Sequence, residues 1–182
     1  GVAGAADLLL GTALAAEQRA YAQAVRSSAE AMLGLVDEIL DMSRIEAGKV
    51  ALQPAPFDPA AIAEQAAELL APRAQAKGLD FAVFVAPDTP ALITADAARL
   101  RQILLNLAGN AVKFTEAGGV GLRVEPAGAG LRFSVSDTGP GFDPADAARL
   151  FGEFERGADE AGTPGVGLGL AISARLAEAM GV

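Results

Sequence analysis

Apolar positions in the first 49 residues follow a helical pattern that no proline interrupts. We expect a short helix through 8–10 that stops at Gly11, followed by a longer helix over about 15–46. Along the longer helix, apolar residues recur at alternating steps of four and three. This heptad spacing is typical of helices that wind around one another in a left-handed bundle. The residues are Val25, Ala29, Met32, Val36 and Ile39.

Further apolar side chains widen this surface beyond what one short helix of the same chain can cover. They are Leu33, Leu35, Leu40 and Met42. The pattern therefore favours a helical hairpin that pairs with a second copy of the chain, which would give a dimeric four-helix bundle. The alternative is that the long helix packs against the domain that follows it, because heptads also occur in ordinary cores.

Three prolines, at 54, 56 and 59, mark a boundary, and we divide the chain into 1–49 and 50–182. Beyond the boundary, helix starts are marked by Asp58-Pro59 and by Asp96. Helices and strands are mixed, and the last two strands form a hairpin. These features favour an α+β sandwich with helices on one face of a mixed sheet rather than a Rossmann fold. The expected elements are helices over about 59–77, 96–114 and 168–180, and strands over 81–85, 120–125 and 131–136.

Composition and charge exclude several classes of function. The net charge of -9 argues against binding to nucleic acid or to an anionic membrane surface, because both need clustered Lys and Arg. The chain contains no Cys and no His, so we expect neither disulfides nor Ser-His-Asp or Cys-His catalysis within it. Every apolar run is interrupted before it reaches transmembrane length. We therefore expect a cytoplasmic chain without direct membrane contact, and whether a longer protein is anchored upstream stays open.

Three polar residues share one face of the helix expected over 96–114. Asn106, Asn110 and Lys113 stand at i, i+4 and i+7, beside an apolar stripe on the same helix. An amide oxygen is a suitable ligand for Mg²⁺, and a lysine is a suitable partner for phosphate. The alternative interpretation is a solvated helix face, which is common for polar stripes.

A carboxylate follows the strand expected over 131–136. Asp137 is followed by Gly139 and Gly141 in the sequence Asp-Thr-Gly-Pro-Gly. A carboxylate at a strand end can accept a hydrogen bond from an adenine amino group, while a glycine turn lets the base approach. The alternative is a simple turn.

Two further motifs lie closer to the C-terminus. Phe151-Gly-Glu-Phe-Glu-Arg156 places an arginine near two aromatic residues, where it could reach a phosphate or could simply lie on the surface. The sequence Gly-Val-Gly-Leu-Gly over 165–169 opens the last expected helix. Glycine-rich backbone at a helix start offers N–H groups to phosphate oxygens, although flexible packing would use the same residues.

The order and spacing of these four motifs resemble the N, G1, F and G2 boxes of the histidine kinase branch of the GHKL ATPases. The resemblance extends upstream, through Ser-Arg-Ile-Glu-Ala-Gly-Lys over 43–49 and Pro-Phe-Asp over 56–58, and so covers nearly the whole chain. It implies a dimerisation hairpin followed by a GHKL, or Bergerat, ATP-binding domain. It also implies a sensor histidine kinase of a two-component system.

The resemblance assigns roles at the matching positions. Asn110 would coordinate Mg²⁺ and Asn106 would support the phosphates of ATP. Asp137 would read adenine, with Gly139 and Gly141 shaping its turn. Phosphate contacts would come from Lys113 and Arg156, and from a loop that closes on the triphosphate, which consists of Gly165, Val166, Gly167, Leu168 and Gly169. Among these residues, Asn106 and Lys113 would act in catalysis. The γ-phosphate would go to a histidine and then to an aspartate on the receiver domain of a response regulator.

The sequence departs from the family pattern at both ends. A phosphoacceptor histidine is absent, and by resemblance it would precede Gly1 by about two helical turns. The family also continues into further strands beyond Met180. We therefore expect a fragment of a longer kinase, and the alternative is a relative that lacks the histidine.

Two other functions compete with the kinase. The first is a non-enzymatic scaffold, a pseudo-kinase that dimerises and recruits a signalling partner. It would have no need of Asn110 or Asp137. The second is another GHKL ATPase of the chaperone or mismatch-repair type. Such an enzyme would use a carboxylate base where this chain has Asn106, and an amide cannot take a proton from water.

Overall fold

The computed structural model describes residues 1–46, 51–146, 149, 151–152 and 168–181. The chain divides into two compact units, Gly1–Gly48 and Lys49–Val182, which we call unit 1 and unit 2. Unit 1 is helical, and unit 2 combines helices with a mixed sheet. Among the described residues, every helix is too short or too polar to cross a membrane.

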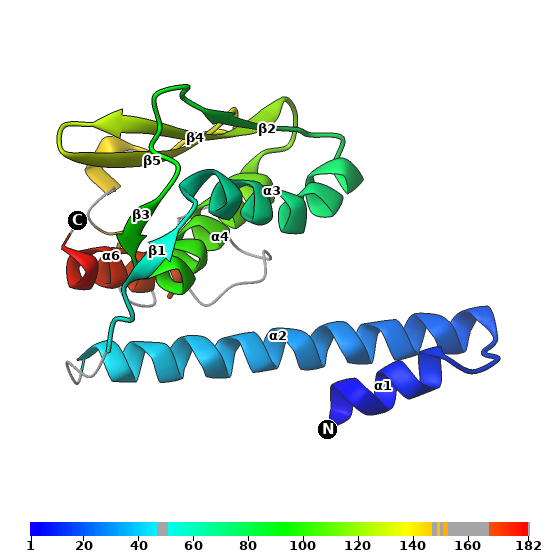
Figure 1. Cartoon of the computed structure of the whole chain (residues 1–182). Coiled ribbons are helices and arrows are strands. Elements are labelled where there is room, and N and C mark those ends of the chain that lie inside the picture. Colours follow the sequence, from blue (N-terminus) through cyan, green and yellow to red (C-terminus); the bar gives the residue numbers. More distant parts are fainter. Residues whose placement is uncertain (47–50, 147–148, 150, 153–167, 182) are drawn as a thin grey trace. The chain divides into compact units, whose positions relative to one another are not determined.

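Unit 1 is a hairpin of two helices, α1 (Val2–Leu10) and α2 (Ala16–Glu46) (Figure 1). The turn between them starts at Gly11, whose N–H donates to the carbonyl oxygen of Asp7 at 3.1 Å. The hydroxyl of Thr12 donates to the carbonyl oxygen of Leu9 at 2.7 Å and closes the last turn of α1. The predicted short helix ending at Gly11 and the predicted long helix over about 15–46 are therefore confirmed.

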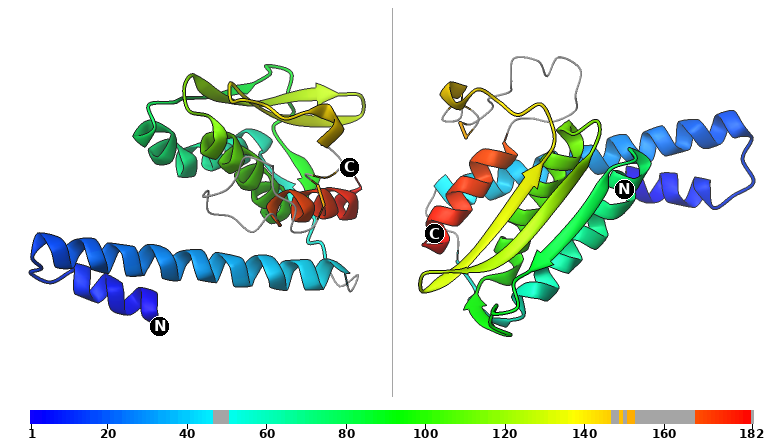
Figure 2. Two further views of the ribbon diagram at one scale, coloured as in Figure 1. Left: turned by 180° about the vertical axis from the view of Figure 1, so that it is seen from behind. Right: turned by 90° about the horizontal axis from the view of Figure 1, so that it is seen from above.

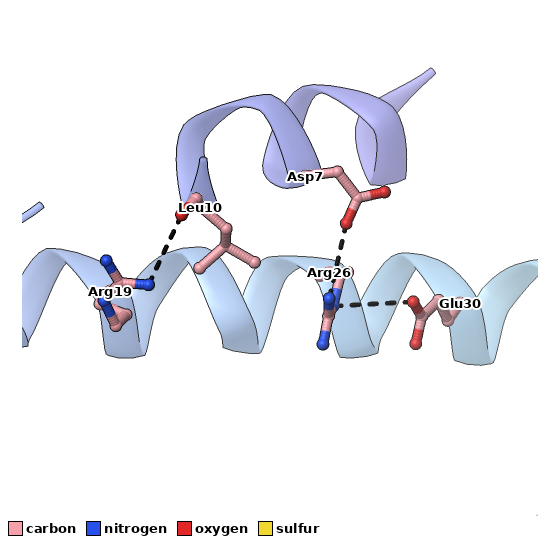
Figure 3. A network of polar contacts seen from close by, with 5 residues as sticks. All are labelled: Asp7, Leu10, Arg19, Arg26 and Glu30. Carbon is pink, nitrogen blue, oxygen red and sulfur yellow. Dashed lines mark hydrogen bonds and ion pairs between the residues drawn. The ribbon is translucent and has the colours of Figure 1, made fainter. Parts of the chain in front are cut away.

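Polar contacts join α1 to α2 along one side of the hairpin (Figure 3). The guanidinium of Arg26 lies 3.6 Å from the carboxylate of Asp7 on α1 and 3.7 Å from that of Glu30 on α2. About two helical turns before Arg26 on α2, the guanidinium of Arg19 donates to the carbonyl oxygen of Leu10 at 3.5 Å. Such exposed ion pairs contribute only about 0–1 kcal/mol each, so they align the two helices more than they stabilise them.

The heptad seam of α2 is exposed. Helix α1 has 9 residues and α2 has 31, so α1 spans only about 14 Å of the roughly 46 Å length of α2. Along the seam, the exposed fractions are 47% for Val25, 67% for Met32, 47% for Val36 and 50% for Ile39. Ala29 is half-buried. Within unit 1, the apolar surface of α2 therefore exceeds what α1 can cover.

The sheet of unit 2 has the strand order β2-β4-β5. Strand β2 (Asp80–Val85) runs parallel to β4 (Gly119–Ala127), and β4 runs antiparallel to β5 (Gly130–Asp137). The predicted mixed sheet with a terminal hairpin is confirmed. Both hairpin strands extend one or two residues beyond their predicted bounds at each end, and beside the turn the ladder pairing continues to Ala127 and Gly130.

Two helices cover one face of this sheet, α3 (Pro59–Ala76) and α4 (Ala97–Phe114), as Figures 1 and 2 show. Alternate residues of the strands point toward the helices, which gives β2 its strict exposed and half-buried alternation. The core joins Ile62 and Ala66 of α3 and Leu104 of α4 to Leu122 and Val124 of β4. This core therefore fixes the position of α4 relative to the sheet.

Carboxylate caps start both covering helices. Asp58 accepts the N–H of Ala60 at 2.8 Å, and Pro59 occupies the first position of α3. Asp96 caps α4 in the same way. Helix α6 (Gly169–Met180) packs beside α4 and ends at Gly181, whose φ of +80° is the left-handed conformation that glycine favours. The three predicted helices of unit 2 are confirmed.

Two short strands were not predicted. Strand β1 (Ala55–Phe57) pairs antiparallel with β3 (Ile93–Ala95), from Ala55 opposite Ala95 to Phe57 opposite Ile93. A one-turn 3₁₀ helix, η1 (Pro144–Asp146), follows β5. The β1–β3 pair brings the segment before α3 next to the start of α4.

Candidate functional site

The first turn of α4 is fixed by the buried carboxylate of Asp96, which is 7% exposed. One carboxylate oxygen accepts the N–H groups of Ala98 at 3.1 Å and Arg99 at 3.0 Å, and the other accepts the N–H of Gln53 at 2.9 Å. Burial raises the pKa of Asp96, but the backbone donors and the charge of Arg99 outweigh burial and hold the pKa below its ordinary value of 3.8. Asp96 is therefore ionised at neutral pH and anchors the helix that carries the polar stripe.

The polar stripe of α4 consists of Asn106, Asn110 and Lys113, and all three side chains are half-buried. The apolar face of the same helix is sealed against the core through Leu104, Ala108, Ala111 and Val112. The ammonium of Lys113 lies over the ring of Phe114, 4.4 Å from its centroid. The stripe therefore lies at the border between the core and the surface, where a ligand can reach it.

The C-terminal end of α4 is held by a lysine from outside the predicted motifs. The ammonium of Lys77 donates to three carbonyl oxygens, those of Val112 at 3.0 Å, Lys113 at 2.7 Å and Thr115 at 2.9 Å. A cation at this position also complements the negative end of the helix dipole. Lys77 thereby fixes the backbone that carries Lys113. Sequence reasoning missed this role, because only the packing of α3 beside α4 brings the two ends together.

The turn after β5 presents the carboxylate of Asp137. The N–H of Gly139 donates to Asp137 Oδ1 at 2.8 Å, so one carboxylate oxygen shapes the turn, and the Asp137 side chain as a whole is exposed. The hydroxyl of Thr138 accepts the N–H of Gly119 at 3.0 Å and donates to the carbonyl oxygen of Ala117 at 2.8 Å. Asp137 is therefore positioned by its own bond to Gly139 and by the bonds that hold the adjacent Thr138.

Glycine is required at two places in this turn. A Cβ at Gly139 would lie 2.8 Å from Asp137 Oδ1 and 3.3 Å from both the carbonyl oxygen of Phe114 and the hydroxyl of Thr115. Gly141 has a φ of +68°, which other residues rarely adopt. The close approach at Gly139 also shows that the Asp137 turn packs directly on the end of α4.

The start of α6 packs on the other part of the stripe. A Cβ at Gly169 would overlap Asn106 Oδ1 and would lie 2.9 Å from Asn106 Cγ. On the next turn of α6, Ser173 accepts a hydrogen bond from Asn106 Nδ2 at 2.7 Å. Leu168, just before the helix, is buried. Ser173 is a second contact that the sequence motifs did not indicate.

The structure thus brings together residues from three of the four predicted motifs. Asn106 meets Gly169, and the end of α4 meets Gly139. The remaining predicted residues lie outside the described residues, namely Arg156, Gly165, Val166 and Gly167. Among the described residues there is no group of three or more Asp or Glu side chains that could hold a metal by itself.

Two family models match the chain. Residues 95–182 match the model of the histidine kinase-, DNA gyrase B-, and HSP90-like ATPases. A match to that model alone does not distinguish between the kinds of ATPase that its description names. Residues 1–48 match the model of the His Kinase A (phospho-acceptor) domain, which singles out one of them. The chain belongs to the sensor histidine kinases.

Relatives of this sensor histidine kinase chain align along its whole length. It is 37% identical to the sensor protein TorS of Escherichia coli (strain K12), and 41% identical to the sensory/regulatory protein RpfC of Xanthomonas campestris pv. campestris. Both alignments cover 100% of the chain, but only 20% of TorS and 26% of RpfC. The chain therefore spans about a quarter or less of these curated relatives.

Solved structures agree with the sequence relatives. The sensor histidine kinase chain is 50% identical to full-length ShkA, whose crystal structure is a complex with AMPPNP. The match has a TM-score of 0.83 and covers 99% of the chain and 38% of ShkA. The predicted fold, a helical hairpin followed by a GHKL-type α/β sandwich, is confirmed by this match and by the family models.

Proposed function

We propose that the chain is the dimerisation and ATP-binding core of a sensor histidine kinase. In this proposal residues 1–49 form the dimerisation hairpin and residues 50–182 form the catalytic domain. The catalytic domain transfers the γ-phosphate of ATP to a histidine outside this chain, for relay to a receiver aspartate. The proposal rests on the arrangement in unit 2, where the Asp137 turn packs on the end of α4 and Gly169 packs on Asn106.

The Asp137 turn fits an adenine base. Asp137 Oδ1 is engaged by the N–H of Gly139, so Oδ2 is the oxygen that would accept a hydrogen bond from the exocyclic amino group. Guanine carries a carbonyl oxygen at the same place, and two acceptors facing each other would repel. Gly141 leaves room for the flat face of the base beside the turn, because nothing lies within 4 Å of the place where its Cβ would be. The site should therefore prefer ATP to GTP.

The stripe on α4 fits the phosphates and their metal. The amide oxygen of Asn110 is a hard ligand of the type that Mg²⁺ takes alongside phosphate oxygens and water. Bound Mg²⁺ would supply charge neutralisation at the phosphates. The ammonium of Lys113 would contact a phosphate oxygen. The backbone of Lys113 is held in place by Lys77, whose ammonium donates to the Lys113 carbonyl oxygen at 2.7 Å. Asn106 would support the phosphates one turn earlier, and Arg156 and 165–169 would complete the phosphate contacts.

The chain is suited to transfer the phosphoryl group rather than to hydrolyse ATP. Positioning and electrostatic stabilisation dominate phosphoryl transfer, and the stripe supplies an amide, a second amide and an ammonium. Asn106 cannot act as a general base toward water, which disfavours an ATPase of the chaperone or mismatch-repair type. Because ATP is the proposed substrate, we expect the chain to work in the cytoplasm.

The exposed seam of α2 fits a second copy of unit 1. Met32, Val36 and Ile39 are each about half or more exposed, at the spacing that pairs helices in left-handed bundles. Two hairpins would bury their seams in a four-helix bundle and form a homodimer. A receiver domain is the proposed downstream partner.

Transfer of phosphate to a histidine tests the proposal directly. A phosphoacceptor segment with one histidine would be joined upstream of Gly1, and the protein incubated with Mg²⁺ and ATP labelled in its γ-phosphate. We expect label that is lost in acid and retained in alkali, as for a phosphohistidine. Replacing the added histidine with glutamine, or Asn110 with alanine, should abolish it. Tight binding of Mg-ATP without any labelling would contradict the kinase and favour a pseudo-kinase scaffold.

A further inference from the structure

We propose that Ser173 is a positioning residue of the phosphate site, because it holds the side-chain amide of Asn106 in one orientation. This inference rests on the proposed function and extends it to a residue outside the four motifs. Ser173 lies on α6, and Asn106 lies on α4, 67 positions earlier in the chain. The two side chains meet only because α6 packs beside α4.

The contact is short and shielded from water. Asn106 Nδ2 donates to the hydroxyl oxygen of Ser173 at 2.7 Å, and Ser173 is only 5% exposed. The whole amide group also lies against Gly169, where a Cβ would overlap Oδ1 and would lie 3.1 Å from Nδ2. Gly169 and Ser173 are four residues apart and so lie one above the other on α6. The first two turns of α6 therefore contact both polar atoms of the Asn106 amide.

Packing alone does not explain a hydroxyl at position 173. Its neighbours on α6 are buried and apolar, with Ala171 and Ile172 each 3% exposed and Leu176 fully buried. An alanine would fill nearly the same volume without a polar group to desolvate. A buried hydroxyl is tolerated when it has a partner, and here the partner is the amide that the proposed function places at the phosphates.

A fixed amide orientation has a chemical consequence. An asparagine side chain that rotates freely presents either its oxygen or its nitrogen to a ligand. With Nδ2 bound to Ser173, the amide plane is set, and Oδ1 together with the second Nδ2 proton keeps a constant direction. Preorganisation of this kind strengthens binding because the side chain need not be ordered when the ligand arrives.

A double-mutant cycle tests the proposal on the chain itself. The parent, S173A, N106A and the S173A/N106A double variant are titrated calorimetrically with Mg-ATP and, separately, with adenosine. We expect S173A to weaken Mg-ATP binding about two- to tenfold, the range of one net hydrogen bond. In the N106A background, S173A should have no further effect, because its partner is already gone. Adenosine affinity should stay unchanged in S173A, since the base is read at Asp137. The conservative variant S173T, which keeps the hydroxyl, should bind Mg-ATP like the parent.

The outcomes separate this inference from the proposed function. If N106A weakens Mg-ATP binding but S173A does not, or if the two losses simply add, the positioning role is wrong and the nucleotide site stands. Tighter binding by S173A would show that the bond to Asn106 opposes the ligand, which also overturns the inference. Equal loss of adenosine and Mg-ATP affinity in S173A would indicate general damage to α6. If the parent chain binds no nucleotide, the proposed function fails, and the role of Ser173 fails with it.

Discussion

Replacing Asp96 with alanine removes three backbone contacts at once, and the cost can be worked from them. Loss of the cap on the N–H groups of Ala98 and Arg99 costs about 1 kcal/mol, with a usual range of roughly 0.5 to 2. The N–H of Gln53 loses a charged acceptor at 2.9 Å. Because Gln53 is exposed, water can replace the lost carboxylate, so this contact adds only about 1 kcal/mol to the cost of the substitution. The expected loss is about 2 kcal/mol.

Asp58 provides a matched control. It caps α3 through the N–H groups of Ala60 at 2.8 Å and Ala61 at 3.4 Å and has no third contact comparable to Gln53 among the described residues. Asp58→Ala should therefore cost only about 1 kcal/mol. The difference between the two variants isolates the bond that joins the segment before β1 to the start of α4.

The assay must follow unit 2 separately. The chain has no Trp and a single Tyr, Tyr21, which lies in unit 1, so intrinsic fluorescence would not report on α4. Hydrogen exchange of peptides from α3 and α4, measured over a series of urea concentrations, gives the free energy of unfolding of unit 2 separately from the helices of unit 1. Equal losses in the Asp96 and Asp58 variants would refute the reasoning.

The pH dependence supplies a second check on Asp96. Its folded pKa lies below the ordinary value of 3.8, so its contribution to stability is fully present above that value. The contribution is lost as the pH falls through the folded pKa. The stability gap between the parent and Asp96→Ala should therefore be constant near neutral pH and should shrink below about pH 4. A gap that stayed constant into the acid range would show that the charge of Asp96 plays no part.

Three further predictions concern the end of α4, the adenine turn and the seam. Lys77→Met should lower the stability of unit 2 by about 1 to 2 kcal/mol and increase hydrogen exchange in the last turn of α4; Arg73→Met, which removes another cation from the same end of α3, should change neither. Gly139→Ala should weaken Mg-ATP binding at least about tenfold, because its Cβ would press on Asp137 Oδ1 at 2.8 Å; calorimetry that finds unchanged affinity would show that the turn can yield. Met32→Glu with Ile39→Glu should convert a dimer to a monomer in analytical ultracentrifugation, since two charges would face the seam of the second copy; a dimer that persists would exclude the seam as the interface.

Local sequence signals accounted for most of the fold. Asp58 with Pro59, and Asp96, predicted the starts of α3 and α4 because an N-cap and a first-turn proline act within one helical turn. Strands β1 and β3 were missed, since each has three residues and β1 contains a proline. Such short strands form only because their partners, far apart in the chain, are brought together by the rest of the fold.

The sequence predicted only those site residues that belong to a local sequence pattern. Spacing on one helix indicated Asn106, Asn110 and Lys113, and a strand end followed by glycines indicated Asp137. The roles of Lys77 and Ser173 depend on which helix packs beside α4, and no local pattern encodes that. Arg156 and the phosphate loop over 165–169 stay predictions from resemblance, apart from the contact of Gly169 with Asn106.

The central claim, a nucleotide site at Asp137 and α4, is tested most directly by titrating the chain with ATP in the presence and absence of Mg²⁺. The parent is compared with Asp137→Asn, which keeps the oxygen that accepts the N–H of Gly139 but replaces Oδ2 with a donor. We predict Mg²⁺-dependent binding by the parent and at least a tenfold loss in Asp137→Asn, about the value of a hydrogen bond to a charged group. Absence of binding by the parent, or equal binding by the variant, would contradict the claim.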